Sequence, residues 1–225
     1  MGAEDEATER PGREPIINAP WPAVAIVLAI LGSYAWQAWF AGGDAAIGAL
    51  GFAPADLDRG RWQGLITVMF AHGGWTHAIM NALGALAFGP PVARLMGSSL
   101  RGALAFFAFY LVCGVLSTLG YAVMHLHAVE PVVGASGAVS GLMGAAARLF
   151  DRGDQLAPVT SRAVLSVGLG WIVANALLAV FGAAPLTGGG RIAWEAHIAG
   201  FVLGVLLVGP FARLAGQPRQ VIAPM

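Results

Sequence analysis

The chain has 225 residues, of which 57% are hydrophobic and 11% are charged, and this composition is typical of a membrane protein rather than a soluble domain. Twelve acidic residues balance twelve basic residues, all of them arginine, so the zero net charge gives no indication of a nucleic-acid partner. The single cysteine, Cys113, excludes an intrachain disulfide.

Polar segments flank a long apolar region. Residues 1–19 mix Glu, Asp, Arg and Pro without an apolar core, which predicts a solvated cytoplasmic tail and not a signal peptide. Residues 214–225 are expected to form a second cytoplasmic tail. Residues 20–213 lie between the tails and form the predicted membrane domain, whose apolar runs indicate helices because helices satisfy every backbone polar group in lipid.

Six helices are predicted, so the expected fold class is an all-α bundle of six transmembrane helices. They span about 22–41, 75–93, 102–124, 134–149, 163–182 and 194–212. The fourth run is shorter than the roughly 20 residues that cross a bilayer. We therefore expect this helix to lie inside the bundle, with its start below one membrane surface.

The arginines predict the orientation, because cytoplasmic loops are enriched in basic residues. If the N-terminus is cytoplasmic, only three of the twelve arginines lie outside: Arg59, Arg61 and Arg191. We therefore expect both termini in the cytoplasm, and the loops around residues 50, 128 and 188 on the outer side. The second, fourth and sixth helices then all begin at the outer surface.

The second predicted helix carries His77 and Asn81 near its start. Residues four positions apart share one helical face, so both side chains point the same way. Two donors aimed together can stabilise a developing oxyanion. A histidine at the membrane interface and an asparagine bonded between helices are the structural alternatives.

The fourth predicted helix begins at Gly134-Ala135-Ser136-Gly137. A serine at a helix N-terminus lies beside unpaired backbone N–H groups and the positive end of the helix dipole, which suits an oxyanion. The alternative interpretation is close helix packing, for which Gly and Ser are common in membranes.

The sixth predicted helix carries His197 in its first turns. An ionisable side chain inside a span is a functional candidate, and neutral imidazole is the usual general base for a serine. A packed histidine bonded to a backbone group is the alternative.

Glycines recur at four-residue spacing in both of these helices. Gly137 and Gly141 lie on one face of the fourth helix, and Gly200 and Gly204 lie on one face of the sixth. Two such faces let the helices approach closely enough for the serine and the histidine to meet.

In chain order, H-x-x-x-N (His77, Asn81), G-x-S-G (Ser136) and A-H-x-x-G (His197, Gly200) resemble the rhomboid family of intramembrane serine proteases. The resemblance implies that Ser136 is the nucleophile, that His197 is the general base, and that His77 and Asn81 stabilise the oxyanion. It further implies a location in a bacterial inner membrane and cleavage of single-span or polytopic membrane proteins near the outer surface of the lipid bilayer.

The resemblance covers the chain from about residue 22 to 213 and also assigns structural support of the site. The supporting residues are His72, Gly134, Gly137 and Gly200. The long segment from Gly42 to Met69 resembles the rhomboid first loop, which lies partly in the outer leaflet; a plain extramembrane loop is the alternative.

Two positions depart from the family pattern. Trp62 is followed by Gln63, where rhomboids often have a Trp-Arg pair. Ser140 lies four residues after Ser136, where a tyrosine often supports the histidine.

All twelve acidic residues fall in tails, loops or helix ends. Glu195 is the nearest to His197 in sequence, but a residue two positions away points about 200° around a helix. The sequence therefore predicts a Ser-His dyad without a carboxylate. We expect no metal, because H-E-x-x-H and comparable ligand sets are absent from the sequence, and no cofactor.

Two other functions remain open. A catalytically silent rhomboid-like protein would bind transmembrane clients without cutting them, although such proteins usually lack the serine or the histidine. A small transporter is the third interpretation, but intramembrane charge pairs and paired inverted half-helices are not visible in the sequence.

Overall fold

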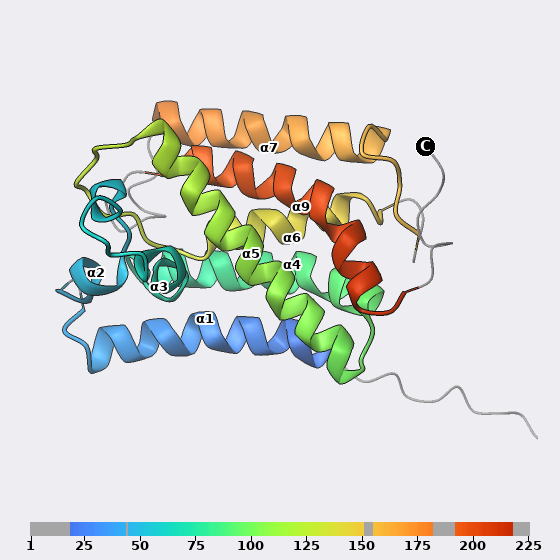
Figure 1. Ribbon diagram of the computed structural model, residues 1–225, viewed down its shortest axis with the longest axis horizontal. Helices are drawn as coiled ribbons and strands as arrows, with labels where there is room; N and C mark the ends of the chain where they lie inside the picture. Colours follow the sequence, from blue (N-terminus) through green and yellow to red (C-terminus); the bar gives the residue numbers. More distant parts are fainter. Residues whose placement is uncertain (1–18, 44, 151–154, 182–191, 218–225) are drawn as a thin grey trace, which may run out of the picture.

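The computed structural model describes residues 19–43, 45–150, 155–181 and 192–217, and this part of the chain is mostly helical (Figure 1). The main helices are α1 (Trp21–Trp39), α4 (Trp75–Met96), α5 (Leu100–Met124), α6 (Ser136–Ala147), α7 (Arg162–Phe181) and α9 (Trp194–Leu214). The six predicted helices are thus confirmed, with ends shifted by a few residues. Residues 1–18 and 218–225, which make up most of the predicted tails at 1–19 and 214–225, lie outside the described residues, as does the loop around residue 188.

The connection between α1 and α4 contains short helical segments that hydropathy did not predict. They are α2 (Ala45–Leu50), η1 (Pro54–Asp56), α3 (Gly64–Thr67) and η2 (Val68–Phe70). Phe52, Val68 and Met69 are buried, so this segment packs against the helices.

Five of the described helices are long and apolar enough to cross a membrane: α1, α4, α5, α7 and α9. The sixth, α6, has 12 residues. At about 1.5 Å per residue it is about 18 Å long, well short of the roughly 30 Å hydrocarbon core. Nearly every residue of α6 is buried, which confirms the predicted short helix inside the bundle. The chain is an integral membrane protein.

Figure 1 shows how the other helices enclose α6. α1 lies at one edge of the bundle, α7 lies at the opposite edge, and α5 crosses obliquely in this view. The residues of α6 are mostly Gly, Ala and Ser, so neighbouring helices approach its backbone closely.

The contact between α6 and α9 depends on glycine. A Cβ atom at Gly200 would overlap the carbonyl oxygen of Gly137, and a Cβ atom at Gly204 would overlap that of Gly141. The structure therefore brings together the two glycine faces found in the sequence. The backbones of α6 and α9 are in direct contact here, and any side chain would force the two helices apart.

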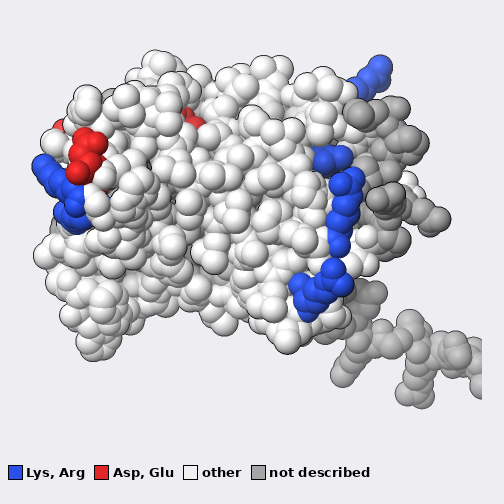
Figure 2. Space-filling view, in the orientation of Figure 1, with Lys and Arg blue, Asp and Glu red and all other residues white. Residues whose placement is uncertain are grey.

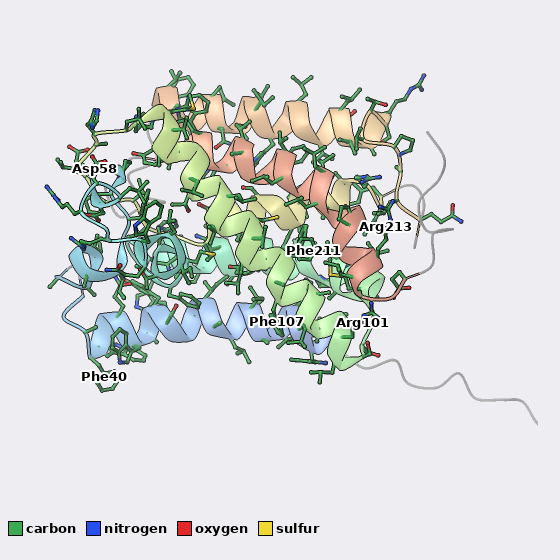
Figure 3. The ribbon with its side chains drawn as sticks, in the orientation of Figure 1. Phe40, Asp58, Arg101, Phe107, Phe211 and Arg213 are labelled. Atoms are coloured by element: carbon green, nitrogen blue, oxygen red, sulfur yellow. The ribbon has the colours of Figure 1, made fainter. Side chains whose placement is uncertain are left out.

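Charges differ between the two ends of the bundle. Among the described residues, the face drawn in Figure 2 shows only basic charged side chains at the end where α4 passes into α5, and charges of both signs at the opposite end. Figure 3 places Arg101 and Arg213 at the first end and Asp58 at the other. Arg101 Nε donates to the Leu214 carbonyl at 2.5 Å and so ties the start of α5 to the end of α9.

Candidate active site

Ser136 is the first residue of α6, and the segment before it is held inside the molecule. Phe52 and Val132 form an isolated antiparallel bridge, and Gly134 N–H donates to the Val68 carbonyl at 2.9 Å. These bonds join the approach to α6 with the connection between α1 and α4. The N-terminus of α6 is therefore held at two points by one segment that is distant in sequence.

The backbone N–H groups at the N-terminus of α6 can donate hydrogen bonds to a ligand. Ala135 precedes the helix, is fully buried and has no side-chain oxygen that could cap it. The first N–H groups of a helix have no acceptor within the helix, and the helix dipole places positive charge at this end. An anion next to Ser136 would therefore be stabilised.

His197 lies one turn into α9 and faces the serine. Its Nε2 atom is 2.7 Å from Ser136 Oγ, although 61 residues separate the two in sequence. A hydroxyl within hydrogen-bond reach of an imidazole is the arrangement of a nucleophile and its base. Glu195 points elsewhere, because its Oε1 atom lies 2.8 Å from His125 Nε2.

His77 presents its other ring nitrogen to the same region. The Gly73 N–H donates to His77 Nδ1 at 3.3 Å, so in the neutral ring the hydrogen is on Nε2. Gly134 has φ +120°, and a Cβ atom there would lie 2.7 Å from His77 Nε2. The glycine thus allows a ring N–H donor to lie directly beside the start of α6.

Asn81 is buried one turn further along α4. Its Nδ2 atom donates to the His77 carbonyl at 2.9 Å, so one amide hydrogen is used within the helix. The nitrogen carries a second hydrogen, and Asn81 lines the same cavity as His77. One of the two amide hydrogens that Asn81 could offer to an oxyanion is therefore already bonded within α4.

A cavity of about 610 Å³ lies between α4 and α7. Its polar lining includes His77, Asn81, Ser136 and His197, which the structure therefore brings together. Most of the remaining wall is apolar, and the volume is in the range of ligand-binding pockets. A second space of about 20 Å³ also touches the serine and is large enough for one water molecule.

His72 lies behind this site and does not line the cavity. Gln37 holds its backbone through two hydrogen bonds, of 2.8 and 3.0 Å. Its ring meets the His77 ring edge-on, with centroids 5.3 Å apart, and among the described residues neither His72 ring nitrogen has a hydrogen-bond partner. Burial, aided by nearby His77, lowers the pKa of His72 to about 3, so the ring is neutral at pH 7.

Asn175 of α7 contacts the site, and the sequence analysis missed it. Its Oδ1 atom lies 2.7 Å from His197 Nδ1, the ring nitrogen that faces away from the serine. In sequence, the candidate partners of His197 are a carboxylate or a backbone group, and the structure instead places a side-chain amide there. The available signal was an amide in the apolar run of α7, where a buried polar group is expected to have a specific partner.

The family's tyrosine position is filled differently here. Ser140 Oγ donates to the Ser136 carbonyl at 2.7 Å, so this side chain bonds to its own helix. The face of the His197 ring is covered instead by Trp171 of α7, whose ring centroid is 5.7 Å away at an interplanar angle of 33°.

The first loop is anchored without a Trp-Arg pair. Trp62 is 59% exposed. Arg61, just before it, lies 3.3 Å from Asp56 and reaches the Gly48 carbonyl at 3.4 Å. An arginine on the other side of the tryptophan therefore connects this loop internally.

A family profile described as the Rhomboid domain matches residues 59–213. The rhomboid protein YdcA of Bacillus subtilis (strain 168) is 35% identical over 90 residues, which are 38% of this chain and 40% of YdcA. Rhomboid protein 1, mitochondrial, of Saccharomyces cerevisiae is 29% identical over 163 residues, which are 69% of this chain and 44% of the yeast protein. RHOMBOID-like protein 9, chloroplastic, of Arabidopsis thaliana is 29% identical over 124 residues, which are 52% of this chain and 26% of the plant protein. The chain thus spans less than half the length of each relative.

Proposed function

Because the chain belongs to the rhomboid family, we propose that it is an intramembrane serine endopeptidase that cleaves transmembrane protein substrates. The observation that carries the proposal is the distance of 2.7 Å between His197 Nε2 and Ser136 Oγ. A histidine base within reach of a serine at a helix N-terminus, in a cavity of substrate size, is suited to acyl transfer.

Acylation follows from this geometry. Ser136 Oγ attacks the carbonyl carbon of the scissile peptide while its proton passes to His197 Nε2. The tetrahedral oxyanion is stabilised by His77, Asn81 and the Ser136 backbone N–H. The C–N bond then breaks, and the imidazolium gives its proton to the leaving amine.

Deacylation needs a water molecule at the ester. The space of about 20 Å³ beside Ser136, lined in part by Ser117 and Thr118, is a suitable position for it. His197 takes a proton from this water as it attacks, and then returns the proton to Ser136 Oγ when the acyl group leaves. The enzyme is thereby regenerated.

The surroundings of the site support a membrane-embedded substrate. Apolar side chains of α4 and α7, including Leu83 and Leu178, line the cavity together with the polar residues. An apolar transmembrane segment can therefore enter between these helices and present its peptide bond to Ser136.

The proposed location is a bacterial inner membrane with both termini in the cytoplasm, with cleavage near the outer surface. Among the described residues, the charged side chains at one end of the bundle in Figure 2 are basic, and this supports the orientation because basic residues accumulate on the cytoplasmic side. α4, α6 and α9 all begin at the opposite end (Figure 1), so in this orientation the proposed site lies toward the outer surface.

The test is labelling by a fluorophosphonate probe, together with cleavage of a single-span protein by the detergent-solubilised enzyme. Ser136→Ala and His197→Ala should each abolish both signals, and the double variant should be scarcely worse, because nucleophile and base act as one unit. Asn81→Ala should lower the cleavage rate by roughly 10²–10³ at most, since other donors remain.

The matched control is Ser166→Ala, which removes an exposed serine of α7 and should retain full activity. Cleavage by purified Ser136→Ala at the wild-type rate would refute the proposed nucleophile. A wild-type chain that neither reacts with the probe nor cleaves substrate would instead favour a catalytically silent rhomboid-like protein.

A further inference from the structure

Asn175 is an exception on a helix that otherwise packs little. Within α7 only Val164 and Asn175 are buried, and Asn175 is 2% exposed. The rest of the helix presents mostly apolar side chains outward, as expected for a lipid-facing span. A polar amide withdrawn from water in such a place is costly unless its atoms are hydrogen-bonded.

Both polar atoms of the Asn175 side chain have partners. Nδ2 lies 2.8 Å from the Trp171 carbonyl oxygen, and Oδ1 lies 2.7 Å from His197 Nδ1. A carbonyl oxygen only accepts hydrogen bonds, so the amide nitrogen must face Trp171 and the amide oxygen must face the histidine. The orientation of the amide is therefore set by the backbone of its own helix.

This orientation determines the tautomer of His197. The amide oxygen also only accepts, so His197 Nδ1 must carry the hydrogen. In the neutral ring, Nε2 then presents its lone pair, and it lies 2.7 Å from Ser136 Oγ. The backbone of α7 thus specifies, through one amide, which nitrogen of the histidine can receive the serine proton.

We infer that Asn175 is a positioning residue that holds His197 in the Nδ1–H tautomer and in the ring orientation required of the base. This inference rests on the proposed protease function. When Ser136 attacks, its proton moves to Nε2, and the Nδ1 hydrogen stays on the ring, bonded to the Asn175 oxygen. No second proton moves, so a neutral amide suffices where other hydrolases use a carboxylate.

Trp171 of α7 also restricts the orientation of the His197 ring. Its ring covers the face of the His197 ring, while Asn175 holds the ring edge. One helix therefore fixes the imidazole in two directions, and the site is complete only when α7 is packed against α9.

The experiment compares Asn175→Leu with Asn175→Asp in the full-length, detergent-solubilised protein. Leucine has nearly the same shape but no hydrogen-bond acceptor. The lost hydrogen bond corresponds to about 1.4 kcal/mol, so kcat for a single-span substrate should fall by at least about tenfold. KM should change little, because Asn175 holds the base and does not bind substrate. Aspartate keeps an oxygen toward Nδ1 in either protonation state, so it should recover most of the wild-type kcat.

Two controls separate positioning from folding. Leu177→Ala changes an exposed residue two positions away and should leave kcat and KM unchanged. Thermal unfolding identifies any variant that does not fold, and Asn175→Ala, which removes the amide without adding bulk, replaces Asn175→Leu if the latter fails.

The outcomes also separate this inference from the proposed function. If wild-type protein is inactive toward both substrate and fluorophosphonate, the proposed function fails and the inference with it. If wild type is active and Ser136→Ala is not, but folded Asn175→Leu or Asn175→Ala keeps the wild-type kcat, only the inference is overturned. An effect confined to KM, or an Asn175→Asp variant as slow as Asn175→Leu, would likewise overturn it.

Discussion

Two histidines in one cavity are set to opposite roles by their hydrogen bonds. His77 accepts from the Gly73 N–H at Nδ1, so its Nε2 atom is a donor. His197 has the oxygen of Asn175 at Nδ1, so its Nε2 atom is an acceptor. The proposed reaction needs this difference, because His197 has to accept a proton and His77 has to donate to the oxyanion. Among the described residues, an amide and not a carboxylate contacts Nδ1 of His197.

The neutral ring of His72 should make stability depend on pH. Its pKa is lowered by burial to about 3 in the folded protein, against 6.5 for an unperturbed histidine. Between these values the unfolded chain binds a proton that the folded chain excludes, so stability is lost as pH falls from about 6.5. Replacing His72 by Phe keeps an aromatic ring and removes the titrating group, so the loss should be smaller.

The measurement is thermal unfolding in detergent at pH 7.5 and pH 4.5. The matched control is His127→Phe, because that side chain is 87% exposed and its removal should leave the wild-type loss of stability intact. An equal loss on acidification in wild type and in His72→Phe would show that this ring is not the group responsible.

At the scale of elements, the α6–α9 contact determines whether the serine and the histidine meet. Replacing Gly200 by Val places two methyl groups and a Cβ atom against the Gly137 carbonyl, which cannot move without shifting α6. Such overpacking should cost on the order of 1–3 kcal/mol of stability. It should also abolish cleavage, because a shift of about 1 Å in the base disrupts the geometry of the reaction.

Gly170→Val is the matched control, since nothing lies within 4 Å of a Cβ atom at that position of α7. Cleavage and thermal unfolding of both variants provide the comparison. Full activity in Gly200→Val would mean that close approach at this turn is not required.

The main helices could be predicted from the sequence because lipid requires long apolar helices, and each apolar run became one. The inward position of α6 followed from its length alone. Asn175 could not be predicted, because its contact with His197 depends on how α7 is rotated about its axis. Apolar side chains lie on almost every face of α7, so its sequence does not indicate which face packs against the bundle.

The same reasoning applies to the connection between α1 and α4. The sequence predicts a loop that lies partly in the outer leaflet, with a plain extramembrane loop as the alternative. It does not predict which apolar residues are buried, and the structure buries Phe52 against the helices while it leaves Trp62 exposed. Arg61 was counted only as an outer charge, because its bonds to Asp56 and Gly48 depend on turns that hydropathy does not predict.

At the scale of the whole molecule, the two ends of the bundle have different properties. α4, α6 and α9 alternate in direction with α5 and α7, so all three begin at the end that carries Asp58 (Figures 1 and 3). The proposed site therefore lies nearer this end than the arginine end. Orientation in the membrane consequently decides on which side a substrate would be cut and its products released.

The orientation can be tested with single cysteines, because the native Cys113 is buried and should not react. Asp58→Cys places a thiol where the side chain is 72% exposed, at the end proposed to face outward. Ser98→Cys places an exposed thiol between α4 and α5, at the arginine end.

A membrane-impermeant maleimide added to intact spheroplasts should label Asp58→Cys and not Ser98→Cys, because the lipid bilayer blocks the reagent. Permeabilisation should expose both thiols, and the unsubstituted chain should remain unlabelled throughout. Labelling of Ser98→Cys but not of Asp58→Cys in intact spheroplasts would reverse the orientation and move the proposed cleavage to the cytoplasmic side.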